Sequence, residues 1–316
     1  GDLGLHAAVE TCKALAAARG CGVDQVLPFS TGVIGEPLPA DRIAVTIPDA
    51  LSALSANGWE AAAKAIMTTD TRPKLCSRQF DCNGHRITVT GMAKGAGMIR
   101  PDMATMLAYI ATDARVAGDL LQACLEQAVA SSFNAITVDG DTSTNDACVL
   151  IASANSDCAP ITSAESQPYL ALCTAVREVC MTLAKAIVRD GEGATKLVEV
   201  RVEGGVSHQE ASAVAYAVAQ SPLVKTALFA GDPNWGRILA AVGRAGVQNL
   251  AIAGVGIWLD DVCIVRNGGR AADYSEQAGQ RVMQQAEFLI RIVLGRGAAD
   301  ARVLTCDLSY DYVRIN

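Results

Sequence analysis

Hydrophobic and polar positions follow two different periods along the chain, and this predicts a protein that mixes helices with strands. Where apolar residues recur every three or four positions, the pattern predicts helices over residues 5–18, 50–56, 59–67, 120–132, 169–188, 207–219, 234–242 and 275–292. Where they alternate or form short continuous runs, it predicts strands over residues 26–29, 86–90, 105–110, 148–152, 196–202, 223–229, 255–259 and 262–266. Asp49 is expected to cap the helix over 50–56, and residues 302–316 are expected to be largely extended.

Helices and strands are interleaved without strict alternation, and paired strands fall between helices. This order predicts an α/β layered sandwich, in which helices cover mixed sheets. The 316 residues are enough for one large or two ordinary domains with a sizeable core. No internal repeat or low-complexity linker interrupts the chain.

Composition narrows the class of protein. Hydrophobic residues make up 51% of the chain and charged residues 19%, which is typical of a globular protein and not of a disordered one. The net charge of −7, without a basic cluster, argues against nucleic acid as a partner. No apolar run approaches the roughly 20 residues of a membrane span. The eleven cysteines are odd in number and lack the CxxC spacing of zinc sites, so reduced, buried thiols in a cytoplasmic protein are expected.

The stretch over residues 94–111, KGAGMIRPDMATMLAYIA, joins a glycine-rich loop to an apolar run that begins at Thr105. A loop that enters a buried strand places its first residue at the rim of a sheet, where a nucleophile is both held and accessible. A threonine hydroxyl needs a neighbouring base, and cutting the Ala104–Thr105 bond would create one, the α-amine of Thr105. The alternative is that Thr105 is an ordinary β-branched residue opening a strand. A phosphate-binding loop is disfavoured because the Walker spacing is missing.

This stretch resembles the cleavage-site signature of the ornithine acetyltransferase family, the glutamate N-acetyltransferases. Six further segments resemble the family pattern in the same order along the chain. They are residues 30–35 (STGVIG), 65–71 (AIMTTDT), 136–146 (ITVDGDTSTND), 190–196 (DGEGATK), 231–237 (GDPNWGR) and 306–316 (CDLSYDYVRIN). Seven matches in order are far more specific than any one of them.

The resemblance implies a fold and a processing step. The implied fold is the αββα layered sandwich of the self-processing family related to aminopeptidase DmpA, with a smaller second lobe. The implied cut between Ala104 and Thr105 divides the chain into an α portion, 1–104, and a β portion, 105–316, at a chain boundary that is not a domain boundary. Both ends are expected to be truncated, since family members carry a longer N-terminal segment and a few residues more at the C-terminus.

The resemblance also assigns the catalytic residues. Thr105 would be the nucleophile and, after cleavage, would supply its own amine as the base. The hydroxyl of Thr31 and the amide of Gly32 would form the oxyanion hole, although the same residues would also suit an ordinary turn.

Four further positions match substrate contacts of the family, and Thr105 is a fifth. Lys94 would meet the α-carboxylate of an amino acid and Glu192 its cationic amine, while Thr68 and Asn316 complete the set. A solvated lysine and a surface acid are the alternatives for the two charged residues. An acidic cluster, Asp139, Asp141 and Asp146, is expected to hold turns and not a metal, because its spacing fits no calcium loop.

The implied activity is a ping-pong transfer of acetyl from N2-acetylornithine to glutamate through acetyl-Thr105, in arginine biosynthesis. No cofactor is implied, with acetyl-CoA as an optional co-substrate. The implied partners are the α and β chains, assembled as a heterotetramer of two each. Two alternatives stay open: an N-acyl amino-acid amidohydrolase or aminopeptidase that passes the acyl group to water, and a non-catalytic relic whose missing N-terminal segment leaves the cleft incomplete.

Overall fold

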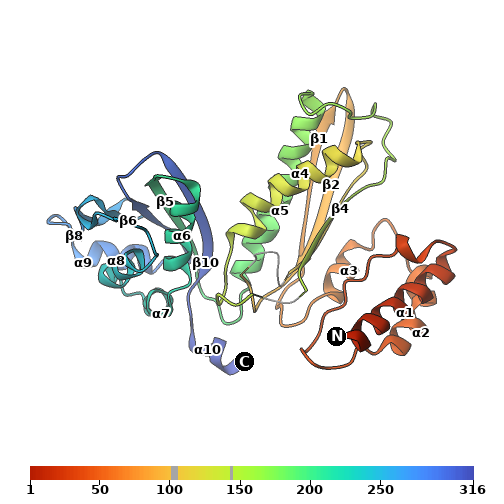
Figure 1. The fold of residues 1–316 in the computed structure, drawn as a ribbon, viewed down its shortest axis with the longest axis horizontal. Helices are drawn as coiled ribbons and strands as arrows, with labels where there is room; N and C mark the ends of the chain where they lie inside the picture. Colours follow the sequence, from red (N-terminus) through yellow and green to blue (C-terminus); the bar gives the residue numbers. More distant parts are fainter. Residues whose placement is uncertain (101–105, 143–144) are drawn as a thin grey trace. The chain divides into compact units, whose positions relative to one another are not determined.

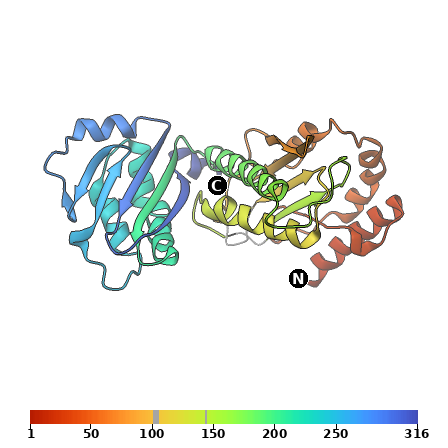
Figure 2. The same cartoon turned by 90° about the horizontal axis from the view of Figure 1, so that it is seen from above.

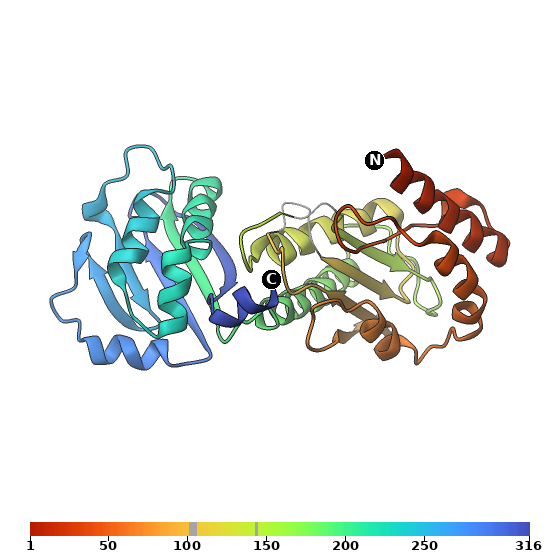
Figure 3. The ribbon, with the colours of Figure 1, turned by 90° about the horizontal axis from the view of Figure 1, so that it is seen from below.

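The computed structural model describes residues 1–100, 106–142 and 145–316, and these form two compact units, 1–66 and 67–316. The first unit is helical, with α1 (Asp2–Arg19), the 3₁₀ turn η1 (Val23–Gln25), α2 (Ala40–Ser52) and α3 (Trp59–Ala65) (Figure 3). The helix α1 ends at Gly20, which takes the left-handed conformation (φ 72°) while its N–H donates to Ala16 O at 2.8 Å.

Two predictions in the first unit are wrong. Residues 26–29 form no strand, and the helix expected over 50–56 is the end of α2, so Asp49 lies in its last turn and caps nothing. The helix begins ten residues earlier than expected and contains Pro48. Ile43 and Ile47 lie four residues apart on one helical face, and burial of Ile47 there favours the helix in spite of the proline.

The second unit contains a four-stranded sheet in the order β1-β2-β3-β4, formed by β1 (Lys74–Cys82), β2 (His85–Lys94), β3 (Leu107–Thr112) and β4 (Ala147–Ala152). Only the β3–β4 pair is parallel. Figure 1 shows α4 (Gly118–Ser131) and α5 (Gln167–Arg189) beside this sheet. The contact with α5 is close: a Cβ added to Gly91 in β2 would lie 2.7 Å from Val179. Glycine at this position therefore lets helix and sheet pack together.

The same unit contains a six-stranded sheet in the order β10-β5-β9-β6-β7-β8 (Figure 2). Its strands are β5 (Leu197–Gly205), β6 (Gly256–Leu259), β7 (Val262–Arg266), β8 (Gly269–Arg270), β9 (Glu287–Val293) and β10 (Ala299–Cys306). The other elements of this unit are η2 (Phe133–Ala135), α6 (His208–Ala219), α7 (Pro222–Ala230), α8 (Trp235–Gly243), η3 (Ile252–Gly254), α9 (Glu276–Met283) and α10 (Tyr310–Ile315). The layered helices and sheets confirm the predicted α/β class.

Three predictions in this half of the chain are wrong. The strand expected over 223–229 is α7, which the Ser221 side chain caps by accepting the N–H of Val224. The helix expected over 275–292 divides into α9 and β9, and the extended segment over 302–316 contains α10 after β10. Within β9, every second residue is buried, which is the period of a strand.

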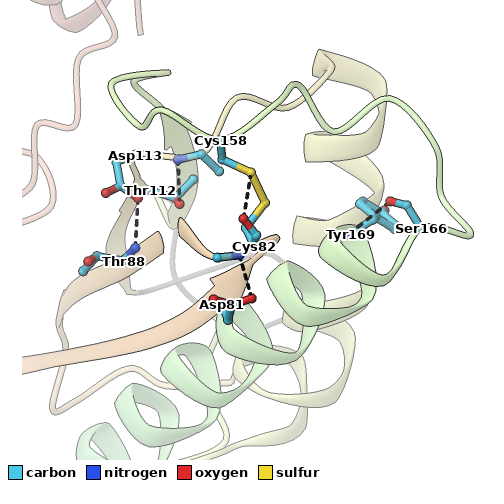
Figure 4. The surroundings of a disulfide bond; sticks show 10 residues. Asp81, Cys82, Thr88, Thr112, Asp113, Cys158, Ser166 and Tyr169 are labelled. Atoms are coloured by element: carbon cyan, nitrogen blue, oxygen red, sulfur yellow. Dashed lines mark hydrogen bonds between the residues drawn. A yellow bond between two sulfur atoms is a disulfide. The ribbon is translucent and has the colours of Figure 1, made fainter. Parts of the chain in front are cut away.

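Two cysteines differ from the expectation that all are reduced. Cys82 and Cys158 form a disulfide, with their Cα atoms 6.4 Å apart, between the end of β1 and the loop after β4 (Figure 4). Nearby, the Thr88 N–H donates to Asp113 at 2.9 Å and ties β2 to the residue that follows β3. The pair lies 76 residues apart in sequence, so no spacing pattern could reveal it. The other nine cysteines are free.

Within the described ranges, no single helix is long and apolar enough to cross a membrane. The bent pair α6 and α7 passes that test only when its two helices are taken together, by length and composition alone.

Candidate active site

Lys94 is the last residue of β2 and lies opposite Leu107, the first residue of β3. Its side chain is buried, with 7% of the residue exposed. Burial lowers the pKa of Lys94, while the carboxylates of Asp70 and Asp146 act to raise it. The predicted substrate-binding lysine is therefore not a solvated loop residue. It is a buried cation at the edge where β3 begins.

Asp146 precedes β4 and brings a carboxyl group to the same edge. Both carboxyl oxygens are buried and have no well-formed hydrogen bond to any residue that the structure describes, although the Met106 amide is close enough to lower the pKa. Burial raises the pKa of Asp146 to about 7, and the nearby Met106 amide and Lys94 oppose that rise only in part. Near neutral pH the group is thus divided between its protonated and charged forms, unlike an ordinary aspartate. Such a group can exchange a proton at this edge of the sheet.

Glu192 lies in the loop after α5 and packs against the glycine-rich loop that follows Lys94. Its N–H donates to Ala96 O at 2.8 Å, and a Cβ added to Gly97 would lie 2.4 Å from its carboxyl carbon. A side chain at position 97 would therefore displace this carboxylate from its place against the loop. The side-chain amide of Asn316 donates to Glu192 at 2.8 Å. Two of the predicted substrate contacts are therefore direct neighbours.

A buried ionic network joins these segments from behind. Lys74 Nζ, at the start of β1, lies 2.5 Å from Asp70 and 2.6 Å from Asp190. Asp70 also accepts the N–H groups of Thr68 at 3.1 Å and Gly95 at 2.8 Å. Burial alone would raise the pKa of Asp70, but these amides and Lys74 lower it overall. The network thereby holds Thr68, the residue after Lys94 and the segment before Glu192.

Sequence reasoning missed the three network residues as functional positions. Asp70 and Asp190 lie inside the segments 65–71 and 190–196 that carry the family resemblance, which was a signal that could have found them. Lys74 lies outside every such segment, and nothing in its local pattern distinguishes it from a surface lysine.

The acidic cluster does not act as one group. Asp139 accepts the N–H groups of Met98 at 2.6 Å and Ile99 at 3.0 Å, so it holds the turn of the central loop, as predicted. Asp141 is exposed, whereas the carboxyl oxygens of Asp146 are buried. Among the described residues, no group of three or more His, Cys, Asp or Glu side chains could hold a metal ion.

Four predicted site residues remain, and the structure does not test their roles. Thr31 and Gly32 belong to the first unit, where both are exposed in an irregular segment before α2. Ala104 and Thr105 lie outside the described residues, and Met106 is the first described residue after them.

Comparisons with known proteins place these residues in a family. The model of the ArgJ family matches residues 1–316. The arginine biosynthesis bifunctional protein ArgJ of Methylococcus capsulatus is 58% identical over 316 residues, 100% of this chain and 77% of its own length. The protein of the same name from Pseudomonas fluorescens is also 58% identical, over 100% of this chain and 78% of its own.

A solved structure agrees with these relatives. The crystal structure of arginine biosynthesis bifunctional protein ArgJ from Bacillus halodurans has a TM-score of 0.64 and 38% identity, and the match covers 67% of this chain and 99% of that one. These findings confirm the predicted acyltransferase of arginine biosynthesis and lend no support to the amidohydrolase alternative. The chain belongs to the ArgJ family, as its motifs predicted.

Proposed function

We propose that this enzyme is a glutamate N-acetyltransferase that takes acetyl from N2-acetylornithine and carries it on Thr105. The observation that supports this most directly is the meeting of Lys94, Glu192 and Asn316 around one glycine-rich loop, where β3 begins two residues after Thr105. A cation and an anion held in this way complement the α-carboxylate and the amine of an amino acid. The proposed reaction also uses acetyl-CoA as a second donor and needs no other cofactor.

The proposed chemistry begins when Thr105 becomes an N-terminus. Its amine accepts the hydroxyl proton as the oxygen attacks the acetyl carbonyl, and the released ornithine amine takes that proton. Glutamate then attacks the acetyl ester by the same path in reverse. Thr31 and Gly32 are proposed as oxyanion donors, each worth about 10²–10³ in rate. Thr68, Lys94, Glu192 and Asn316 are proposed to hold whichever amino acid is bound.

The length of the solved relative supports self-cleavage. Its chain is covered to 99%, yet it matches only 67% of this chain. Residues 105–316 are 212 of the 316 residues, which is also 67%. A solved chain that begins at the equivalent threonine would give this coverage. The α and β chains are then proposed to stay together in the cytoplasm, as a heterotetramer of two each.

Mass spectrometry of the purified chain tests this proposal. The wild-type protein is expected as two fragments, 1–104 and 105–316. Thr105→Ala is expected to stay uncut and to lose at least about 10³-fold in acetyl transfer, because it removes the nucleophile and the amine together. Thr174→Ala, an exposed threonine on α5, is the matched control and should be cut and active. An uncut wild-type enzyme with full activity would overturn the proposal.

A further inference from the structure

Residues 307–316, here called the C-terminal strap, follow β10 and contain α10 (Figure 1). The strap is hydrogen-bonded to the loop over residues 190–196, which follows α5 and carries Glu192. Three of its side chains bind this loop at different positions, and sequence reasoning assigned a role to only one of them, Asn316. The other two are Asp307 and Ser309.

Asp307 is the first anchor of the strap, and it is 2% exposed. Its carboxylate accepts the N–H groups of Thr195 at 2.8 Å and Lys196 at 2.9 Å, and the hydroxyl of Thr195 at 2.6 Å. Hydrogen bonds to a carboxylate are stronger than those between neutral groups. They continue the pairing of β10 with β5, in which Cys306 lies opposite Leu197. The loop is therefore fixed at its C-terminal end.

Ser309 is the second anchor, and it is 5% exposed. Its hydroxyl donates to Gly193 O at 2.6 Å and, as the cap of α10, accepts the N–H of Asp311 at 3.2 Å. Gly193 takes the left-handed conformation (φ 68°), and a Cβ added to it would lie 2.5 Å from the backbone nitrogen of Tyr312. A side chain at position 193 would thus displace the strap. The residue directly after Glu192 is held against the start of α10.

The end of the strap reaches the Glu192 carboxylate itself. The side-chain amide of Asn316 donates to Glu192 at 2.8 Å and to Tyr312 O at 3.1 Å, so one amide joins the carboxylate to α10. The Tyr312 hydroxyl lies 3.5 Å from Asp139, which holds the glycine-rich loop. Burial, and then the charges of Asp139 and Glu192, raise the pKa of Tyr312 to about 12, so its phenol keeps the proton that it can donate.

These contacts restrict Glu192 before any ligand arrives. Its N–H donates to Ala96 O at 2.8 Å, and the strap holds the residue after it and its carboxylate. Glu192 is still partly exposed, so a ligand can reach it. A side chain that is already ordered loses less conformational entropy when it binds. The strength of an ion pair between Glu192 and a ligand cation therefore depends on the strap.

We propose that Ser309 and Asp307 are positioning residues that fix Glu192, so that the C-terminal strap sets the preference of the site for a donor with a cationic side chain. This inference rests on the proposed function. The α-nitrogen of N2-acetylornithine is acetylated, so the side-chain amine is the only cation that this donor offers to Glu192. Because Ser309 and Asp307 are buried, they act through the loop and not on the substrate.

Steady-state kinetics with two donors test the inference. N2-acetylnorvaline has the carbon chain of N2-acetylornithine without the side-chain amine, so it gains nothing from Glu192. Ser309→Ala is expected to lower kcat/KM for acetylornithine by roughly fivefold and to leave kcat/KM for acetylnorvaline within about twofold of wild type. A general loss of structure would lower both values alike. Ser275→Ala, which removes the same kind of cap from α9, is the control and should change neither.

A double-mutant cycle asks whether Ser309 acts through Glu192. Glu192→Gln keeps the size of the side chain and removes its charge, so it should abolish the preference for acetylornithine over acetylnorvaline. Adding Ser309→Ala should then change that preference no further. A further loss of preference in the double variant would overturn the inference, as would equal losses for both donors in Ser309→Ala.

Asp307→Ala is a second variant, and it should show the same selective loss for acetylornithine. If this buried position proves essential for folding, Ser309→Ala alone decides the inference. A wild-type enzyme that uses both donors equally well would overturn the proposed binding of the amine by Glu192, and the inference with it. A wild-type preference for acetylornithine that Ser309→Ala leaves unchanged would overturn the inference and leave the proposed function standing.

Discussion

Asp146 shows that the surroundings of a carboxyl group, and not its residue type, decide its charge. It was predicted as a turn residue, yet burial raises its pKa to about 7. The folded pKa is above the ordinary value of 3.8, so the folded protein binds more protons than the unfolded chain between about pH 4 and 7. The contribution of Asp146 to the free energy of unfolding is therefore largest at low pH, below about 4, and is lost as pH rises through 7.

Asp146→Asn should reverse that loss. The amide carries no charge, so the free energy of unfolding of the variant is expected to exceed that of wild type by roughly 1 kcal/mol at pH 8 and to differ little from it at pH 4. This value is smaller than the full pKa shift would give, because the residue is partly exposed to solvent. Urea unfolding of both proteins at the two pH values measures the difference. A gain that is equal at both pH values would mean that Asp146 is not the titrating group. Asp141→Asn, at an exposed position of the same segment, is the control.

At the scale of single residues, the sequence predicted a site residue only where that residue matched the family pattern. Lys94, Glu192 and Asn316 were found from the family pattern, and the structure brings them to one loop. The role of Gly97 could not be predicted, because it depends on a side chain that lies 95 residues away in the sequence. A buried ionic partner can likewise lie far away in the sequence, as Asp190 does from Lys74, so the sequence around Lys74 did not distinguish it from any other lysine.

Among the elements, the ionic network makes β1 and the end of α5 depend on each other. Lys74 is 2% exposed and lies between two carboxylates, Asp70 and Asp190. Lys74→Met leaves both anions buried without their cation, and it is expected to lower the free energy of unfolding by roughly 3–5 kcal/mol. Lys64→Met removes a surface pair with Glu60 and should cost less than about 1 kcal/mol. Chemical denaturation compares the two, and similar small losses would mean that the network does not support the fold.

The sequence predicted elements well where one period was long and unbroken, as in α5 and α1. The prediction was wrong where a short apolar run fits the period of a helix as well as that of a strand, as in α7. Residues 223–229 alone resemble a strand, and only the helix cap at Ser221 distinguishes them from one. The segment over 275–292 was wrong for another reason. It contains a helix and then a strand, and the three residues 284–286 (QQA) between them, two of them polar, were too few to mark a boundary.

At the scale of the whole molecule, the proposed cut and the compact units divide the chain at different places. The units meet after Ile66, whereas the predicted chain boundary follows Ala104. The α portion would thus contribute β1 and β2 to the same sheet as β3 of the β portion. Backbone hydrogen bonds of that sheet would hold the two chains together after cleavage, which is why cutting at Ala104 need not unfold the protein.

The final prediction concerns how the whole enzyme divides acetyl between an amino acid and water. If one pocket binds donor and acceptor in turn, Lys94 meets the carboxylate of each, and bound glutamate attacks acetyl-Thr105 at high effective concentration. Double-reciprocal plots for acetylornithine and glutamate should then be parallel. Lys94→Met should weaken both substrates together, by roughly tenfold or more, while Lys64→Met should weaken neither.

Three results would contradict this picture in different ways. Loss of glutamate binding alone in Lys94→Met would mean two separate pockets. Intersecting lines would indicate a sequential transferase, in which both substrates are bound before acetyl moves. Acetate released as fast without glutamate as with it would make the enzyme a hydrolase, because water would then compete equally for the ester. If Lys94 and Glu192 hold an amino acid as proposed, that outcome is not expected, since Lys94 precedes the glycine-rich loop opposite the start of β3 and Glu192 packs against the loop.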